Sequence, residues 1–159
     1  MKIRVLFVIS AFILALTGCS QTEQESLKVY SFKGENELFS ISNGIIVLDD
    51  KEEIFRGGDL KVINNDFTDI KSYSTTFYIQ SNDEKYTILS HNAPGDSIGI
   101  NSDLGQISSE SIFEKTELSG EMDLQNNLYF ELKTIDEEDE EHIYPLQLSV
   151  TEVTEDLNH

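Results

Sequence analysis

The sequence predicts an all-β protein, an antiparallel sandwich that is immunoglobulin-like in size, with about eight short strands and at most one short helical turn. Three observations support this class. Apolar and polar residues alternate over several short segments, which is the period of a half-buried strand. Turn-forming residues recur about every ten positions, and no long segment has a helical period. We therefore expect one domain over residues 27–153, followed by a polar tail at 154–159.

The first half of this domain reads as short strands joined by turns. Asn43-Gly44 favours a hairpin turn, and Arg56-Gly57-Gly58 favours a turn or a bulge. The apolar run 45–48 is typical of a strand that is covered on both faces. The expected strands are runs of apolar and β-branched residues at 27–32, 38–41, 45–48, 54–55 and 60–63.

The second half contains the clearest alternation, in which Tyr73, Thr75, Phe77 and Ile79 share one face of a strand. Core packing explains the strand spacing of Phe39, Phe77 and Phe130. Residues 91–106 read mostly as loop, and Ser111 followed by Glu114 has the spacing of a capping box, which predicts a helical turn over 111–118. The expected strands lie at 73–79, 86–90, 128–132 and 144–150, and Ile98 and Ile100 are compatible with a further short strand within the loop.

The N-terminus has the three parts of a secretory signal. Lys2 and Arg4 precede an apolar run from Val5 to Leu16, which only Ser10 interrupts, and small residues follow. This run is shorter than the roughly 20 residues that a membrane span needs. Residues 1–18 are therefore predicted to be a cleaved signal peptide.

Leu16, Thr17, Gly18 and Cys19 at the end of this run resemble a bacterial lipobox. The resemblance implies that a diacylglyceryl group is attached to the Cys19 thiol and that cleavage falls just before Cys19. The chain has no other cysteine. Residues 19–26 would then be the lipidated cysteine and a polar tether, whose last seven residues reach about 25 Å when extended. These features place the protein on the outer face of the cell membrane.

Two segments of the domain resemble a group of small uncharacterised lipoproteins of Gram-positive bacteria. They are Phe32-Lys33-Gly34-Glu35-Asn36-Glu37-Leu38-Phe39 and Asn43-Gly44-Ile45-Ile46-Val47-Leu48. The group carries a tryptophan after its Gly-Glu, where this chain has Leu38 or Phe39. The resemblance agrees with the lipobox and implies no particular activity.

The charge of the chain excludes one class of partner. Without Lys2 and Arg4, 9 basic and 30 acidic residues remain, a formal net charge of −21. Nucleic-acid binding through basic patches needs the opposite sign. The acidic excess increases solubility and attracts a basic partner or diffuse cations such as calcium.

A serine hydrolase is the alternative from a different functional class. Gly95-Asp96-Ser97-Ile98-Gly99 fits G-x-S-x-G and resembles the start of the GDSL-type esterase signature. That resemblance implies Ser97 as nucleophile, with His142 as base and Asp139 as its orienting acid. A nucleophile elbow requires a strand before the serine and a helix after it, however, and here the flanking residues read as loop. No catalytic residue is therefore assigned.

The run Asp136 to Glu141 offers six consecutive carboxylates, which suits weak calcium binding. Neighbouring side chains on an extended segment point in opposite directions, so all six cannot meet on one ion. A solvated hairpin tip is the simpler interpretation. His91 in a loop, His142 at a strand start and the terminal His159 are not spaced as metal ligands, so neither a metal site nor a cofactor is predicted.

Together these observations predict a noncatalytic, lipid-anchored extracytoplasmic domain that contacts the membrane only through its lipid. The domain would present a surface to a protein, glycan or peptide partner. The serine hydrolase and a weak calcium-binding domain remain the alternatives.

Overall fold

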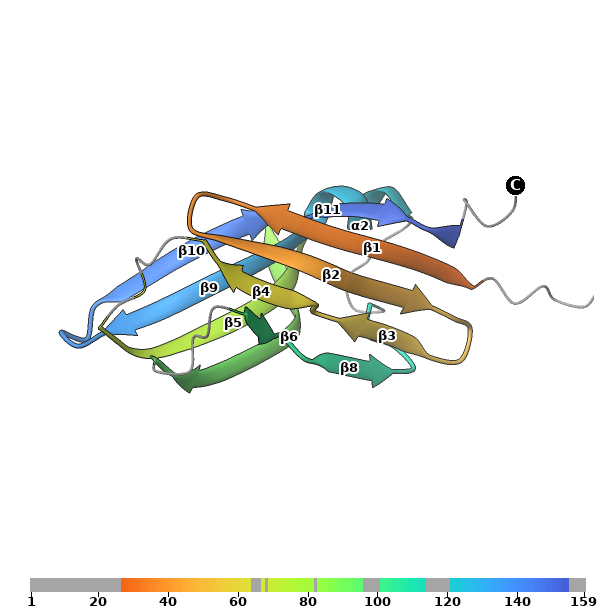
Figure 1. The fold of residues 1–159 in the computed structure, drawn as a ribbon. Helices are drawn as coiled ribbons and strands as arrows, with labels where there is room; N and C mark the ends of the chain where they lie inside the picture. The colour runs from red at the N-terminus through yellow and green to blue at the C-terminus, as the bar shows by residue number, and fades with distance from the viewer. Residues whose placement is uncertain are drawn as a thin grey trace, which may run out of the picture.

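The computed structural model describes residues 27–63, 67, 69–81, 83–95, 101–113 and 121–154, and this part of the chain is an antiparallel β-sandwich with one short helix (Figure 1). The predicted fold class is therefore confirmed. Sheet A contains β1 (Lys28–Glu35), β2 (Phe39–Leu48), β3 (Glu53–Arg56), β4 (Asp59–Val62), β7 (Asn101–Asp103), β8 (Gln106–Ser109) and β11 (Ser149–Glu152). Sheet B contains β5 (Ile70–Ser81), β6 (Glu84–Pro94), β9 (Leu128–Asp136) and β10 (Glu141–Gln147).

Sheet A has the order β11-β1-β2-β3-β8, and its outer strands are interrupted between β3 and β4 and between β7 and β8. We call this line of interruptions the crease. β4 continues the line of β3 and also pairs with β2, and β7 continues the line of β8 and pairs with β4. The interruptions lie at Asn43, Gly58 and Gly105, whose φ angles are 58°, 78° and 81°. Glycine and asparagine tolerate positive φ better than other residues. The register of β2 with β3 and β4 is the same on both sides of these positions, as is the register of β3 and β4 with β8 and β7.

Asn43-Gly44 does not form the predicted hairpin turn. β2 runs through both residues, and two residues of β2 oppose one of β1 in a bulge near Gly44. The turn between β1 and β2 lies earlier, where Asn36 Oδ1 accepts hydrogen bonds from the backbone N–H groups of Leu38 and Phe39 at 2.9 and 3.0 Å. Asn36 thus makes an Asx-type turn through its side chain, whereas Asn43 adopts a positive φ within a strand bulge.

Sheet B has the order β10-β9-β5-β6, and its strands contain from 7 to 12 residues. The predicted alternation in β5 is confirmed, because Tyr73, Thr75, Phe77 and Ile79 are all buried. β6 continues to Pro94, so residues 91–94 belong to a strand and not to the predicted loop. The hairpin between β9 and β10 encloses the acidic run, as predicted.

The alternation at residues 144–150 passes from one sheet to the other. Tyr144 and Leu146 belong to β10 in sheet B, whereas Val150 belongs to β11 in sheet A. Leu148 lies between them, is 1% exposed, and donates its backbone N–H to the Leu128 carbonyl at 2.9 Å. A single alternating pattern in the sequence therefore contributes core residues to both sheets.

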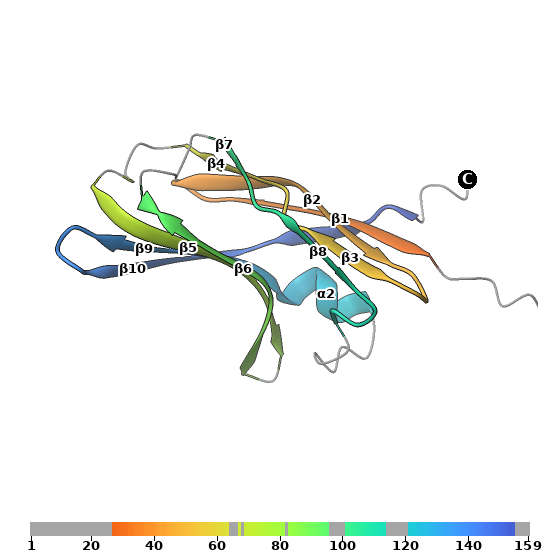
Figure 2. The same ribbon diagram turned by 90° about the horizontal axis from the view of Figure 1, so that it is seen from below.

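The one helix in the described residues is α2 (Glu121–Asn127), which lies after the predicted helical turn. Residues 111–113 have no regular structure, and 114–118 lie outside the described residues. In Figure 2 the two sheets diverge toward the end of the sandwich where α2 lies. Leu124 of α2 is 4% exposed, so the helix contributes to the core there.

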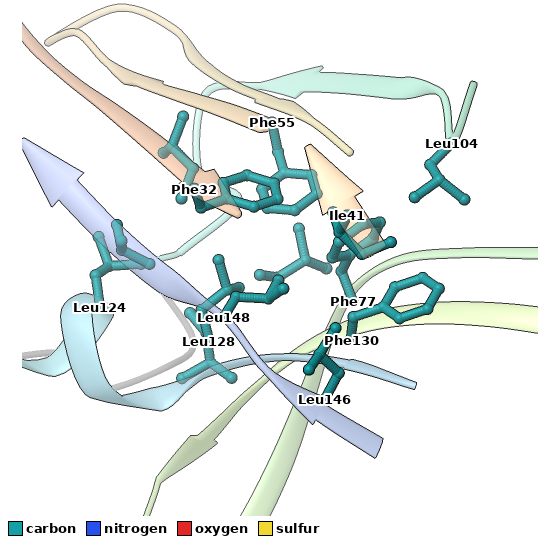
Figure 3. Packing of buried hydrophobic residues seen from close by; sticks show 14 of the residues in the cluster. Phe32, Ile41, Phe55, Phe77, Leu104, Leu124, Leu128, Phe130, Leu146 and Leu148 are labelled. Carbon is teal, nitrogen blue, oxygen red and sulfur yellow. The ribbon is translucent and has the colours of Figure 1, made fainter. Parts of the chain in front are cut away.

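The core is a cluster of aromatic rings from both sheets (Figure 3). Phe32 stacks on Phe55 within sheet A with ring centroids 5.3 Å apart, and Phe77 of sheet B packs edge-on against Phe55 at 5.1 Å. Phe130 continues the cluster at 5.1 Å from Phe77, and Phe39 packs edge-on against Phe130. Edge-on pairs of this kind add about 0.5–1.5 kcal/mol each beyond area burial. The predicted core positions Phe39, Phe77 and Phe130 are confirmed.

The run 45–48 is not covered on both faces as predicted. Ile46 points inward and is 0% exposed, but Ile45 is 37% exposed and Val47 is only partly buried. A run of apolar residues cannot by itself distinguish a strand between two layers from one whose outward side chains shield each other.

Candidate functional site

Small polar side chains cover much of the outer face of sheet B. Ser72, Ser74 and Thr76 alternate along β5 with the buried residues of that strand. The register places Asn92 of β6 opposite Ser74, and the hydroxyls of Thr76 and Ser90 lie 3.2 Å apart. These side chains can both donate and accept hydrogen bonds.

Two lysines frame one end of this face. Lys71 is the extra residue of a β-bulge between β5 and β9, and such a bulge re-aims a side chain. Its ammonium pairs with Asp139, which raises the pKa of Lys71. Lys133 of β9 forms an ion pair with Glu141 at the start of β10. Both carboxylates come from the acidic hairpin, which supplies the counter-ions of the two lysines.

A hollow of about 530 Å³ lies between these lysines and the end of β6. Among the described residues, its lining includes Lys71, Lys133, two serine hydroxyls and the Asn92 amide, and it contains no carboxylate. Tyr73, which is buried at 8% exposure, also borders it. Pro94 and Ile135 add apolar surface. In a chain with 30 acidic residues, this is a local concentration of hydrogen-bond donors.

An aromatic pair lies farther along the same face. Tyr78 of β5 and Tyr129 of β9 stack with ring centroids 5.5 Å apart, and Lys85 lies 4.4 Å from the centre of the Tyr78 ring. Lys85 also reaches across β5 to Glu131, at 2.9 Å. Burial raises the pKa of Tyr78, and the nearby Lys85 ammonium opposes part of that rise. Tyr78 is thus enclosed and stabilised as a neutral phenol.

The acidic hairpin is ordered around Asp136. Its Oδ1 accepts hydrogen bonds from the backbone N–H groups of Glu138 and Glu140 at 2.9 and 2.8 Å. Its Oδ2 lies 3.1 Å from His142 Nε2, which can donate when that nitrogen is protonated. The Glu140 N–H and then the His142 contact hold the pKa of Asp136 below its usual value. The carboxylate therefore closes the turn.

Asp136, Glu140 and His142 also form a cluster in which one ligand atom from each lies within 4.8 Å of the others. Sequence spacing missed this cluster because the residues meet across a turn. A cation would have to compete with the hydrogen bonds that Asp136 already accepts. Exposed acidic groups often lie together without binding an ion.

In the described part of the chain, the two other predicted hydrolase residues, Asp139 and His142, each contact a different residue. Asp139 pairs with Lys71, and His142 contacts Asp136 instead of Asp139. Ser97 lies outside the described residues, as do residues 96–100 around it. The flanking segments are not the predicted loops: β6 ends at Pro94 and β7 begins at Asn101, both in antiparallel sheets. A described strand thus follows the motif, where a nucleophile elbow has a helix.

Other predicted site residues have mixed outcomes. His91 lies in β6 and not in a loop, whereas His142 is at a strand start as expected. His159 lies outside the described residues, as does Cys19 with its motif residues Leu16, Thr17 and Gly18. Lys71, Lys133 and Asn92 were not identified from the sequence. Their only sequence signal was their position beside buried residues on alternating strands.

The fold and this surface define an antiparallel β-sandwich with a polar hollow on one outer face. No helix in the described residues is long and apolar enough to cross a membrane. Comparison of the chain with protein-family models, curated proteins and solved structures gave no significant match.

Proposed function

We propose that this chain is a noncatalytic binding domain that a lipid on Cys19 holds at the outer face of the cell membrane. The observation that carries the proposal is the N-terminal sequence, in which Leu16-Thr17-Gly18-Cys19 follows a basic start and an apolar run. One acyl chain gives marginal membrane binding, whereas two give a stable anchor. The diacylglyceryl group that the lipobox resemblance implies meets this requirement.

The spacing of the chain supports the same arrangement. β1 begins at Lys28, so a short polar segment separates it from Cys19. That segment can extend about 25 Å. The net charge of −21 without the first basic residues repels anionic headgroups within a Debye length of about 8 Å. The domain would therefore stand away from the lipid surface and keep its faces accessible.

The outer face of sheet B supports a binding role. It combines a hollow, hydroxyl and amide groups, and lysines whose carboxylate partners lie on an exposed hairpin. The contacts of Asp139 and His142 with other residues weaken the case for the hydrolase. A noncatalytic binding role requires only surface groups that can contact a ligand, and sheet B displays such groups.

The test is the chemical state of Cys19 in cells that express the full chain. Mass spectrometry should find a mature N-terminus at Cys19 carrying a diacylglyceryl group, and the protein should enter the detergent phase on detergent partition. Cys19→Ala should remain uncleaved and unlipidated, whereas Ser20→Ala, one residue away, should behave as wild type.

Two outcomes would contradict the proposal. A wild-type chain that keeps Met1, or one released with an unmodified Cys19, would remove the anchor. A fluorophosphonate probe that labels wild type but not Ser97→Ala would replace a noncatalytic domain with a serine hydrolase.

A further inference from the structure

We propose that the hollow between Lys71, Lys133 and Asn92 on the outer face of sheet B binds a sugar that carries a phosphate group. This inference rests on the proposed function, since it names the ligand class of the binding domain. The described lining supplies two ammonium groups, two serine hydroxyls and one amide, with no carboxylate.

The charge of the lining favours an anionic ligand. A phosphate has several acceptor oxygens, and each lysine ammonium has three donors. One carboxylate partner, Asp139 for Lys71 and Glu141 for Lys133, leaves donors on each ammonium for a ligand. A lining without carboxylates can accept an anion even in a chain with a formal net charge of −19.

The two ion pairs are weak enough to be exchanged. The side chains of Lys71 and Asp139 are 52% and 71% exposed, and those of Lys133 and Glu141 are 35% and 47% exposed. Exposed ion pairs contribute little to stability because water and salt screen them. The hairpin carboxylates therefore act as internal counter-ions that a phosphate can replace without loss of the fold.

The remaining lining suits a sugar ring. Ser72, Ser74 and Asn92 offer donors and acceptors to ring hydroxyls, and Pro94 and Ile135 offer apolar surface to the carbon skeleton. A volume of about 530 Å³ falls within the range of small-ligand sites.

Calorimetry on the full chain in detergent at physiological salt tests the inference. Glucose 6-phosphate should bind in the millimolar range or tighter, with glucose and inorganic phosphate each at least about tenfold weaker because each lacks half of the contacts. A mannan with phosphodiester groups tests whether the natural ligand is a free sugar phosphate or part of a polymer. If the mannan binds more tightly than glucose 6-phosphate, the site is assigned to a unit of a polymer.

Three variants show where the ligand binds. Lys71→Gln and Lys133→Gln should each raise the dissociation constant about tenfold, because each removes a charged hydrogen-bond donor. Lys85→Gln is the matched control, since Lys85 lies on the same face and pairs with Glu131 but does not line the hollow. Asp139→Asn should tighten binding, because it removes a competing carboxylate. Circular dichroism establishes that each variant is folded.

Absence of binding at millimolar glucose 6-phosphate would overturn the inference, as would equal effects of Lys71→Gln and Lys85→Gln. Glucose that binds as tightly as its phosphate would also overturn it. None of these results bears on lipidation of Cys19, so failure of this inference and failure of the proposed function are distinguishable.

Discussion

The outer faces of the two sheets differ in chemistry although their inner faces are alike. On sheet A the register places Val29, Val47 and Ile54 side by side across three strands, with Ile45 beside them. On sheet B the outward positions of β5, β6 and β9 carry mainly serine, threonine, asparagine and lysine, together with the Tyr78–Tyr129 pair, Glu131 and Ile135. Both inner faces are filled by phenylalanine, leucine and isoleucine. The inward residues therefore define the sandwich, and the outward residues distinguish its two surfaces.

The construction of the sheets differs as well. Sheet A combines β1 and β2, of 8 and 10 residues, with five strands of three or four residues, whereas β5 and β6 in sheet B are continuous over 12 and 11 residues. Long strands carry outward side chains in register over a greater length, and the polar hollow lies on them. The aliphatic residues of sheet A shield one another across neighbouring strands.

The crease in sheet A offers the largest expected effect. A Cβ on Gly58 would lie 2.1 Å from the Ser42 carbonyl oxygen, whereas a Cβ on Gly105 would have no neighbour within 4 Å, and both residues have positive φ. Gly105→Ala should lower the free energy of unfolding by about 1–2 kcal/mol, from backbone strain alone. Gly58→Ala adds the steric clash and should cost about 2–4 kcal/mol. Urea denaturation measures the free energy of unfolding of both variants. Equal losses would contradict the interpretation that the backbone approaches Gly58 too closely for a side chain.

The contrast between inner and outer faces can be tested at adjacent positions of β2. Ile46→Thr places a hydroxyl where the side chain is 0% exposed, and we expect a loss of about 2–3 kcal/mol in the free energy of unfolding. Val47→Thr lies on the outer face, where water can reach the hydroxyl, and should cost less than about 1 kcal/mol. Similar losses from both variants would mean that the aliphatic face of sheet A is covered.

The smallest effect concerns the hairpin beside the hollow. The folded-state pKa of Asp136 is lowered from 3.8, so its ionised form stabilises the fold above that pH, and this contribution is lost as pH falls through the folded-state pKa. Carboxyl NMR should place the Asp136 midpoint below 3.8. His142→Gln should raise this midpoint without restoring 3.8, because the Glu140 N–H has the larger influence. A wild-type midpoint at or above 3.8 would contradict the turn described.

Local patterns predicted much of the fold. Alternation identified β5, β9 and the 144–150 segment because burial of one face imposes a period of two. The same patterns failed at Asn43-Gly44, where a residue suited to positive φ serves a strand bulge and not a turn. The extent of β6 was also missed, because pairing with β5 keeps residues 91–94 extended although they lack an apolar alternation.

The candidate site was much less predictable. The acidic hairpin was identified as a loop, but its pairing with Lys71 and Lys133 depends on how β5, β9 and β10 meet. These lysines are separated from their partners along the chain or across a turn, and single residues on alternating strands carry no motif. The hydrolase residues illustrate the opposite situation. Asp139 and His142 match a sequence motif, but in the structure His142 contacts Asp136.

By itself, the sequence determined the strand class, most core residues and a lipoprotein-type N-terminus that stands as a prediction. These properties depend on period, composition and consecutive residues, which are local. Tertiary structure alone decided the crease of sheet A, the crossing of the chain at Leu148 and the grouping of Lys71, Lys133 and Asn92. Strand order and register set those features, because they bring together residues that are distant in sequence.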